Sequence, residues 1–322
     1  MNAQGEDHGR RLGAGIGNFI AGANEHKDLG AVRAWPADRL WCLEREAGPR
    51  VRPAPEGPRE VSGTFSVLAA DDAPPFSVHN ADGRFPFLIV ADHAGNAVPG
   101  ALDGLGLGRA DRERHIAWDI GIAGVCRSLS DLLGATLIQQ NYSRLVIDCN
   151  RPPGTPQSIP EESDGTRVPG NQGLEPSARR AREAQIFDPY HARIAAEIDR
   201  RMNAGRPAVL IAMHSFTPVW DGAQRPWHAG VLHRGDSRLA NALLGLLRQD
   251  GALTVGDNAP YDIGDATDWT IPVHGESRGI LHVGIEIRQD LIQHEEGQAM
   301  WAARFGALLP LALSECGAAA TG

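Results

Sequence analysis

The sequence predicts an α/β domain. From Phe85 onward, short apolar runs alternate with longer amphipathic stretches, which is the pattern of strands alternating with helices. Two of the runs, 87–91 and 208–213, are continuously apolar, as is typical of strands buried on both faces of a sheet. Both runs are followed at once by polar residues that include a histidine. We therefore expect these two runs to be central strands with polar groups at their ends.

The remaining elements are predicted from the same two periodicities. Beyond the two central runs, strands are expected at 135–140, 144–148, 231–233, 253–255 and 283–287. Amphipathic stretches predict helices at about 110–133, 176–204, 236–250 and 295–315. Gly134, Gly205 and Gly251 stand where glycine commonly ends a helix, which supports these boundaries.

The 322 residues allow one large domain or two ordinary ones, and we expect a single domain over 61–316. Residues 1–60 are rich in Gly, Pro, Arg and Glu without periodicity, which predicts a flexible N-terminal extension, with a partner-binding arm as the alternative. Residues 317–322 are expected to form a short tail. The segment 152–176 holds six prolines and predicts a long loop, either a lid over a site or a plain surface excursion.

Charge and composition argue against several classes of protein. The 31 Lys and Arg against 40 Asp and Glu give a net charge of −9, which repels phosphate backbones, so nucleic acid is not an expected partner. Four widely spaced cysteines predict reduced thiols in a cytoplasmic protein. Neither a signal-type apolar region nor an apolar run of ~18 residues is present, so export and membrane insertion are not expected. The oligomeric state stays open.

Polar side chains follow four of the predicted strands, at the carboxyl ends where open α/β sheets bind ligands. Neutral imidazoles and carboxylates, with one position left for water, are the ligands of a catalytic zinc ion. His93 and His214 are therefore the expected zinc ligands, and a hydrogen-bonded structural histidine is the alternative for each. The four polar stretches are 92–96, 148–151, 214–215 and 286–288.

Six runs in the same region resemble N-formylglutamate amidohydrolases over about residues 85–310. They are ADHAGNAVP from Ala91, HIAWDIG from His115, SRLVIDCNRP from Ser143, MHSFTP from Met213, VGDNAPY from Val255 and IEIRQDLI from Ile285. The resemblance implies a three-layer α/β/α fold with a mixed central sheet, similar to zinc carboxypeptidases and aspartoacylases, and a site with one zinc ion.

The activity that this resemblance implies is hydrolysis of the amide bond of a small N-acyl acidic amino acid, above all N-formylglutamate, giving formate and glutamate. One alternative is a related zinc deacylase or carboxypeptidase-like hydrolase with another substrate. A second alternative, of a different class, is a non-catalytic module that binds a ligand with the same fold.

The third zinc ligand needs a separate argument. Carboxypeptidase-like sites take two ligands from an HxxE motif, but the third residue after His93 is Asn96, a poor zinc ligand. Asp119 is the candidate, with His115, four residues earlier on the same face of the predicted helix, or another carboxylate as alternatives. Glu286 lies in an apolar strand, where a carboxylate needs a partner. The resemblance implies that it is the general base, and an ion pair with Arg288 is the alternative.

The arginines near these motifs are candidates for binding carboxylates, because a guanidinium donates two parallel hydrogen bonds. By resemblance, the pair Asn150 and Arg151 holds a substrate carboxylate. Arg288, placed beside the catalytic Glu286, and Arg144 are candidates for clamping a second one. An internal ion pair with Asp148 is the alternative for Arg144.

Two further residues are candidates for contacting the substrate. Ser215 directly follows a predicted zinc ligand, but no GxSxG elbow surrounds it, so we expect it to support the site rather than to act as a nucleophile. Tyr261 lies at a predicted strand end or loop, where its hydroxyl could polarise the scissile carbonyl. A structural role is the alternative for Tyr261.

Overall fold

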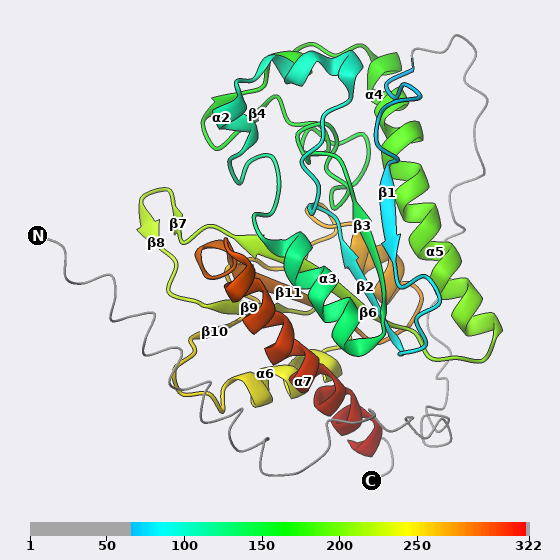
Figure 1. The fold of residues 1–322 in the computed structure, drawn as a ribbon, viewed down its shortest axis with the longest axis vertical. Helices are drawn as coiled ribbons and strands as arrows, with labels where there is room; N and C mark the ends of the chain where they lie inside the picture. The colour runs from blue at the N-terminus through cyan, green and yellow to red at the C-terminus, as the bar shows by residue number, and fades with distance from the viewer. Residues whose placement is uncertain (1–65, 320–322) are drawn as a thin grey trace, which may run out of the picture.

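A seven-stranded mixed sheet forms the centre of the computed structural model, which describes residues 66–319 (Figure 1). β1–β3 and β11–β9 are antiparallel pairs, and the other neighbours are parallel. Because β2, β6 and β11 are parallel neighbours, their carboxyl ends meet at one edge of the sheet. The strand order is β1 (Phe76–His79), β3 (Thr136–Gln140), β2 (Phe87–Ala91), β6 (Val209–Phe216), β11 (His282–Arg288), β9 (Ala229–Leu232) and β10 (Val255–Asp257).

Helices cover both faces of the sheet. One face carries α3 (Ile122–Leu133), α6 (Arg238–Leu247) and α7 (Glu295–Ala319), which lie together in Figure 1. The other carries α4 (Pro176–Arg182) and α5 (Asp188–Asn203), joined by the π-helical turn η4 (Glu183–Phe187). Alternate strand residues point to the two layers: Ile89 and Ile211 face the first group of helices, and Leu88 and Leu210 face the second. The predicted three-layer fold with a mixed sheet is confirmed.

Shorter elements lie between the main ones. Two small hairpins are formed by β4 with β5 and by β7 with β8. The bounds are η2 (Gly100–Gly106), α2 (Arg109–Arg112), β4 (Glu162–Ser163), β5 (Thr166–Arg167), η3 (Pro169–Asn171), β7 (Val219–Trp220), β8 (Ala223–Gln224), η5 (Ile271–Glu276) and η6 (Gln289–Leu291).

The predicted helix at 110–133 is wrong in its first half. Only α2 and α3 are helical, and the backbone between them makes turns and tertiary hydrogen bonds instead. Asp119 N donates to the carbonyl of His93 (2.9 Å), and Arg144 N donates to the carbonyl of Ala117 (3.0 Å). Gly121, at φ 82°, is the N-cap residue of α3, and a Cβ there would lie 2.0 Å from the Ile292 carbonyl oxygen. His115 and Asp119 therefore share no helical face.

The predicted strand at 144–148 is also wrong. This stretch folds as a turn, in which Val146 N donates to Ser143 O (2.9 Å), and Asp148 N donates to Ser158 O (2.8 Å). Its apolar residues are nevertheless buried against α5 and its neighbours. A short apolar run thus signalled burial correctly, but burial alone does not distinguish a strand from a buried turn.

The segment 152–176 is more ordered than an irregular loop. It contains the β4–β5 hairpin and η3, and Asn171 anchors it by donating to the carbonyls of Leu145 (2.9 Å) and Pro160 (2.7 Å). Buried Arg182 donates in turn to Asn171 Oδ1 (2.7 Å). This anchoring holds the segment beside the carboxyl ends of the central strands.

Two predictions concern the ends of the chain. The expected flexible extension, 1–60, lies outside the described residues. The expected tail starts at 317, and α7 continues to Ala319. Among the described residues, no helix combines the length and the apolar character needed to cross a membrane.

Candidate active site

Three buried side chains meet at the carboxyl edge of the sheet. His214 belongs to β6, and His93 follows the neighbouring strand β2 by two residues. Asp119 comes from the turn before α3, which its backbone bond to His93 holds in place. His214 Nδ1 lies 3.2 Å from His93 Nδ1 and 3.1 Å from Asp119 Oδ2, and His93 Nδ1 lies 3.6 Å from the same oxygen. The three predicted metal ligands are thus brought together.

Two further carboxylates fix the orientation of the histidine rings. His93 Nε2 is 2.6 Å from Asp148 Oδ1, and His214 Nε2 is 3.4 Å from Asp92 Oδ2. Asp92 is itself held by hydrogen bonds from Tyr190 and Thr270, each 2.8 Å long. A proton on each Nε2, directed at these carboxylates, leaves both Nδ1 atoms with lone pairs that point to each other and to Asp119.

This donor set fits a divalent cation. Two imidazole lone pairs and a carboxylate oxygen within 3.6 Å of one another repel unless a positive charge lies among them. Ligand atoms on a tetrahedral zinc ion lie roughly 3.3 Å apart, close to the separations found here. Burial by itself would raise the pKa of Asp119, but the two histidines hold that pKa well below its usual range. Asp119 is therefore anionic, as a ligand must be.

Glu286 stands beside this group without a partner of its own. It lies on β11, in register with His214 on the adjacent strand β6, so both side chains point to the same face of the sheet. The side chain is buried, and its Oε2 accepts no hydrogen bond from any described residue. Burial raises the pKa of Glu286 to about 7, although the nearby histidines oppose the rise. A carboxyl group with such a pKa can gain and release a proton near neutral pH.

A main cavity of about 530 Å³ opens over these four residues. Its wall includes residues from the segment 157–164 and from the segment 261–271. Five of the predicted substrate-binding residues also line it, namely Arg144, Asn150, Arg151, Ser215 and Tyr261. The main cavity thus gathers nearly all the residues that the sequence singled out.

The arginines of the main cavity are already engaged. Arg144 donates to Asp148 Oδ2 (2.7 Å) and lies 3.5 Å from Asp119 Oδ1, so the predicted ion pair with Asp148 is present. Arg151 donates to the carbonyls of Thr267 and Asn150, and its guanidinium is 4.0 Å from Asp268. These contacts hold both guanidinium groups in fixed positions on the cavity wall.

Asn150 and Ser215 act mainly on the surrounding backbone. Asn150 Oδ1 accepts from the backbone N–H groups of Trp269 (3.1 Å) and Thr270 (3.0 Å) and so ties the 267–270 turn to the site. Ser215 N donates to Asp119 Oδ2 (3.1 Å), and its hydroxyl donates to the Ile120 carbonyl. Ser215 thereby positions Asp119.

Arg288 and His115 lie differently from what the sequence led us to expect. Arg288 is bound to Asp290 (2.8 Å) and to two backbone carbonyls, and it is not among the residues that line the main cavity. The alternative ion pair between Glu286 and Arg288 is absent from the described residues. His115 lines the cavity 3.3 Å from Asp164 but stands outside the His93, Asp119 and His214 group.

Sequence reasoning missed the role of Asp92 and left Asp148 only as a partner of Arg144. Asp92 directly precedes His93 in the chain, yet it supports His214. The signal available in the sequence was the position of both aspartates at strand or run ends. Which histidine each aspartate contacts depends on long-range pairs: Asp148 and His93 are 55 positions apart in the chain, and Asp92 and His214 are more than 100 positions apart.

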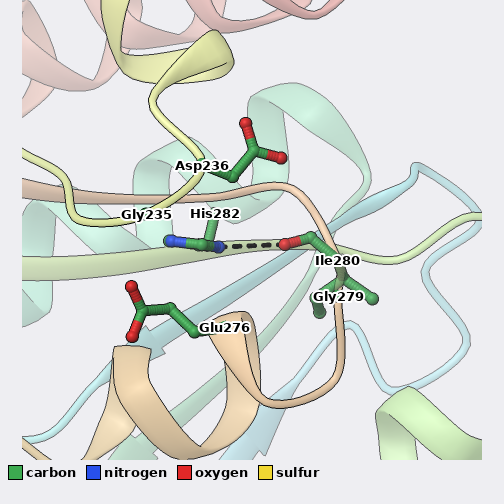
Figure 2. A pocket seen from close by; sticks show the side chains of 6 residues that line it. All are labelled: Gly235, Asp236, Glu276, Gly279, Ile280 and His282. Atoms are coloured by element: carbon green, nitrogen blue, oxygen red, sulfur yellow. Dashed lines mark hydrogen bonds between the residues drawn. The ribbon is translucent and has the colours of Figure 1, made fainter. Parts of the chain in front are cut away.

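A second, smaller cavity of about 190 Å³ lies elsewhere (Figure 2). Asp236 and Glu276 line it on either side of His282, whose Nδ1 is 2.9 Å from the Ile280 carbonyl. Arg238 pairs with Asp236 (2.6 Å), and Arg234 lies 3.5 Å from Glu276. Since both carboxylates have cationic partners, this cavity offers no counterpart to the group around His93.

A mixed α/β sheet with a buried His–Asp–His group and a free carboxyl group at its carboxyl edge defines an α/β protein with a candidate hydrolytic metal centre. The model of the family described as N-formylglutamate amidohydrolase matches residues 85–293. The chain belongs to this family.

Curated relatives carry the same description. An N-formylglutamate deformylase of Pseudomonas aeruginosa is 29% identical over 173 residues, and one of Pseudomonas putida is 30% identical over 184 residues. Each match takes in 51% of this chain, and they span 60% and 66% of the two relatives.

Solved structures support the fold. The Agrobacterium tumefaciens gene product Atu2144 is 40% identical with a TM-score of 0.75, and the match covers 77% of this chain and 98% of that one. An N-formylglutamate amidohydrolase from Ralstonia eutropha is 19% identical with a TM-score of 0.56, covering 75% and 98%. The second likeness extends to the fold alone.

Proposed function

We propose that this chain is a zinc-dependent amidohydrolase that removes the formyl group from a small N-formyl acidic amino acid, N-formylglutamate being the expected substrate. The convergence of His93, Asp119 and His214 beside the unpaired Glu286 is the observation that carries the proposal. Family membership and the names of the two Pseudomonas relatives support the choice of substrate. The catalytic domain is taken to span 61–316.

The proposed division of labour follows from the side chains. A cation held by His93, Asp119 and His214 would supply positive charge that acidifies a water molecule and stabilises the oxyanion. Asp148 and Asp92 keep both Nδ1 lone pairs directed at that cation. Arg151 and Arg144 present N–H donors to a substrate carboxylate on the wall of the main cavity. Arg288, engaged with Asp290, is left outside this scheme.

Glu286 carries the protons of the reaction. As a carboxylate it accepts a proton from the attacking water, whose oxygen forms a bond to the formyl carbon. The carbon–nitrogen bond then breaks as Glu286 delivers this proton to the amine nitrogen, and Glu286 next transfers the second water proton from the hydroxyl group of the new formic acid to the same nitrogen. The products are formate and the amino acid in its ammonium form.

Three free cysteines, Cys126, Cys149 and Cys316, are buried in the described chain, which supports a reducing, cytoplasmic location for the reaction. The proposed partner is the small-molecule substrate. A related deacylase acting on a larger acyl group is the rival within the same chemistry, and a non-catalytic ligand-binding module is the rival outside it.

Formate release distinguishes these possibilities. Purified chain reconstituted with one equivalent of zinc is incubated with N-formyl-L-glutamate or N-acetyl-L-glutamate, and formate and free glutamate are measured. The proposal predicts rapid hydrolysis of the formyl compound and slow hydrolysis of the acetyl compound. Preference for the acetyl compound favours the related deacylase, and no hydrolysis of either compound refutes the proposed activity.

A further inference from the structure

Arg225 stands directly after the β7–β8 hairpin, and although it does not line the main cavity itself, it contacts residues that do. Its guanidinium carbon lies 4.9 Å from the ring centre of Tyr261, 5.2 Å from that of Trp220 and 5.8 Å from that of Phe216. Nη1 donates to the Tyr261 hydroxyl (2.9 Å) and lies 3.5 Å from Thr217 Oγ1. All four of these neighbours line the main cavity.

The guanidinium of Arg225 lacks an anionic partner. Within residues 66–319, no carboxylate oxygen lies within 4 Å of it, and its Nε and Nη2 groups make no hydrogen bond. Arg114 and Arg144, which also lie at or beside the main cavity, each contact two aspartates. The guanidinium of Arg225 is thus half-buried beside the cavity, and its Nε and Nη2 donors are free.

The surroundings of Arg225 hold it in place. Three aromatic rings restrict the guanidinium, and the Tyr261 hydroxyl fixes Nη1. Arg288 Nη1 donates to the carbonyls of Arg225 (3.3 Å) and Trp227 (3.4 Å), which fixes the backbone of this segment. A cation that is held before binding loses little conformational freedom when an anion arrives.

Tyr261 links this cation to the reacting centre. Burial raises the pKa of Tyr261, and the charge of Glu286 adds to the rise, so the hydroxyl lies within the field of the proposed base. Thr217 follows His214 by three residues along the same chain segment. Arg144 and Arg151, which line the cavity themselves, come from a different segment than Arg225.

We propose that Arg225 binds the second carboxylate of a dicarboxylic N-formyl amino acid and thereby selects acidic side chains. This inference rests on the proposed deformylase activity. Nε and Nη2 would form the two parallel hydrogen bonds of a bidentate guanidinium–carboxylate pair. Arg151 and Arg144 would hold the other carboxylate. Arg288 then acts as a positioning residue for Arg225.

Specificity, rather than activity alone, tests this role. Formate release is measured with N-formyl-L-glutamate and with N-formyl-L-glutamine, which has nearly the same shape but no side-chain charge. We expect the wild type to favour the glutamate compound in kcat/KM by about 100-fold, since the charge pair with half-buried Arg225 is lost with the amide. In Arg225→Met the ratio should fall toward one, mainly through KM for the glutamate compound, and Arg225→Lys should restore part of it. Arg278→Met, which removes an arginine paired with Asp199, is the matched control and should keep the wild-type ratio.

Equal losses on both substrates in Arg225→Met, with an unchanged ratio, would mean that Arg225 only braces the hairpin, and would overturn the inference. If the wild type hydrolyses neither compound, the proposed activity fails, and calorimetry with glutarate then decides about Arg225 separately. Glutarate binding that is lost in Arg225→Met and kept in Arg278→Met supports the anion site. Equal binding by wild type and Arg225→Met, or no binding by either, overturns it.

Discussion

Replacing Glu286 with glutamine should stabilise the metal-free protein and strongly lower the activity of the zinc-loaded protein. The pKa of this buried carboxyl group rises from an ordinary 4.5 to about 7. Because each tenfold change in a proton equilibrium corresponds to about 1.4 kcal/mol, ionised Glu286 costs the folded chain about 3 kcal/mol. Glutamine has nearly the same shape and does not ionise, so it avoids that cost.

The sign of the pH dependence follows from the raised pKa. The folded chain holds this proton more tightly than the unfolded chain does, so the contribution to stability is complete below pH 4.5 and is lost as the pH rises through about 7. The free energy of unfolding of Glu286→Gln should therefore exceed that of the wild type by under about 1 kcal/mol at pH 5 and by about 3 kcal/mol at pH 8. The difference at pH 8 corresponds to a rise in Tm of roughly 6 to 12 °C.

Urea unfolding of metal-free protein at pH 5 and pH 8 measures this difference, and formate release after zinc reconstitution measures activity. Activity should fall by roughly 10²- to 10⁴-fold. Glu315→Gln, on the exposed side of α7, is the control and should show neither effect. If the stability gap between Glu286→Gln and the wild type were the same at both pH values, the argument from a buried, ionisable Glu286 would be refuted.

Two further predictions concern the surroundings of the site. Asp148→Asn should weaken zinc binding by roughly 10- to 100-fold, measured by competition with a coloured chelator, because His93 loses the carboxylate that orients it. Asp199→Asn, at the surface, is the control and should not change zinc binding. Equal zinc affinities of Asp148→Asn and the wild type would exclude the orienting role. If the segment 152–176 is a lid, trypsin cleavage after exposed Arg167 should slow about tenfold when glutarate is present at ten times its Kd in zinc-loaded protein. Unchanged cleavage would exclude the lid.

Much of the fold could be read from the sequence because the central strands are buried on both faces. Continuous apolar runs mark β2 and β6, a largely apolar run marks β11, and the polar residues at their ends lie at one edge once the strands pair in parallel. His93 and His214 could be found for this reason. At 144–148 the apolar run led us to predict a strand, but its buried side chains belong to a turn.

The parts of the site that escaped prediction depend on contacts between distant segments. Asp119 was selected on a helix that does not exist, and it reaches the site because the His93 carbonyl accepts its backbone N–H. Asp92 contacts His214 and Thr270, which are 122 and 178 positions away in the chain. Arg225 gains its aromatic neighbours from a short hairpin and from the loop at Tyr261. Local periodicity carries no information about such pairings.

The metal content of the purified chain tests the central claim most directly. After dialysis against metal-free buffer, the wild type should retain about one equivalent of zinc, as expected for one site with three protein ligands. His93→Ala and His214→Ala should retain none. His233→Ala, which removes a histidine paired with Asp257 outside the group, should retain the full equivalent. A wild type that binds no divalent metal, or variants of His93 and His214 that bind it as tightly as the wild type, would contradict the account.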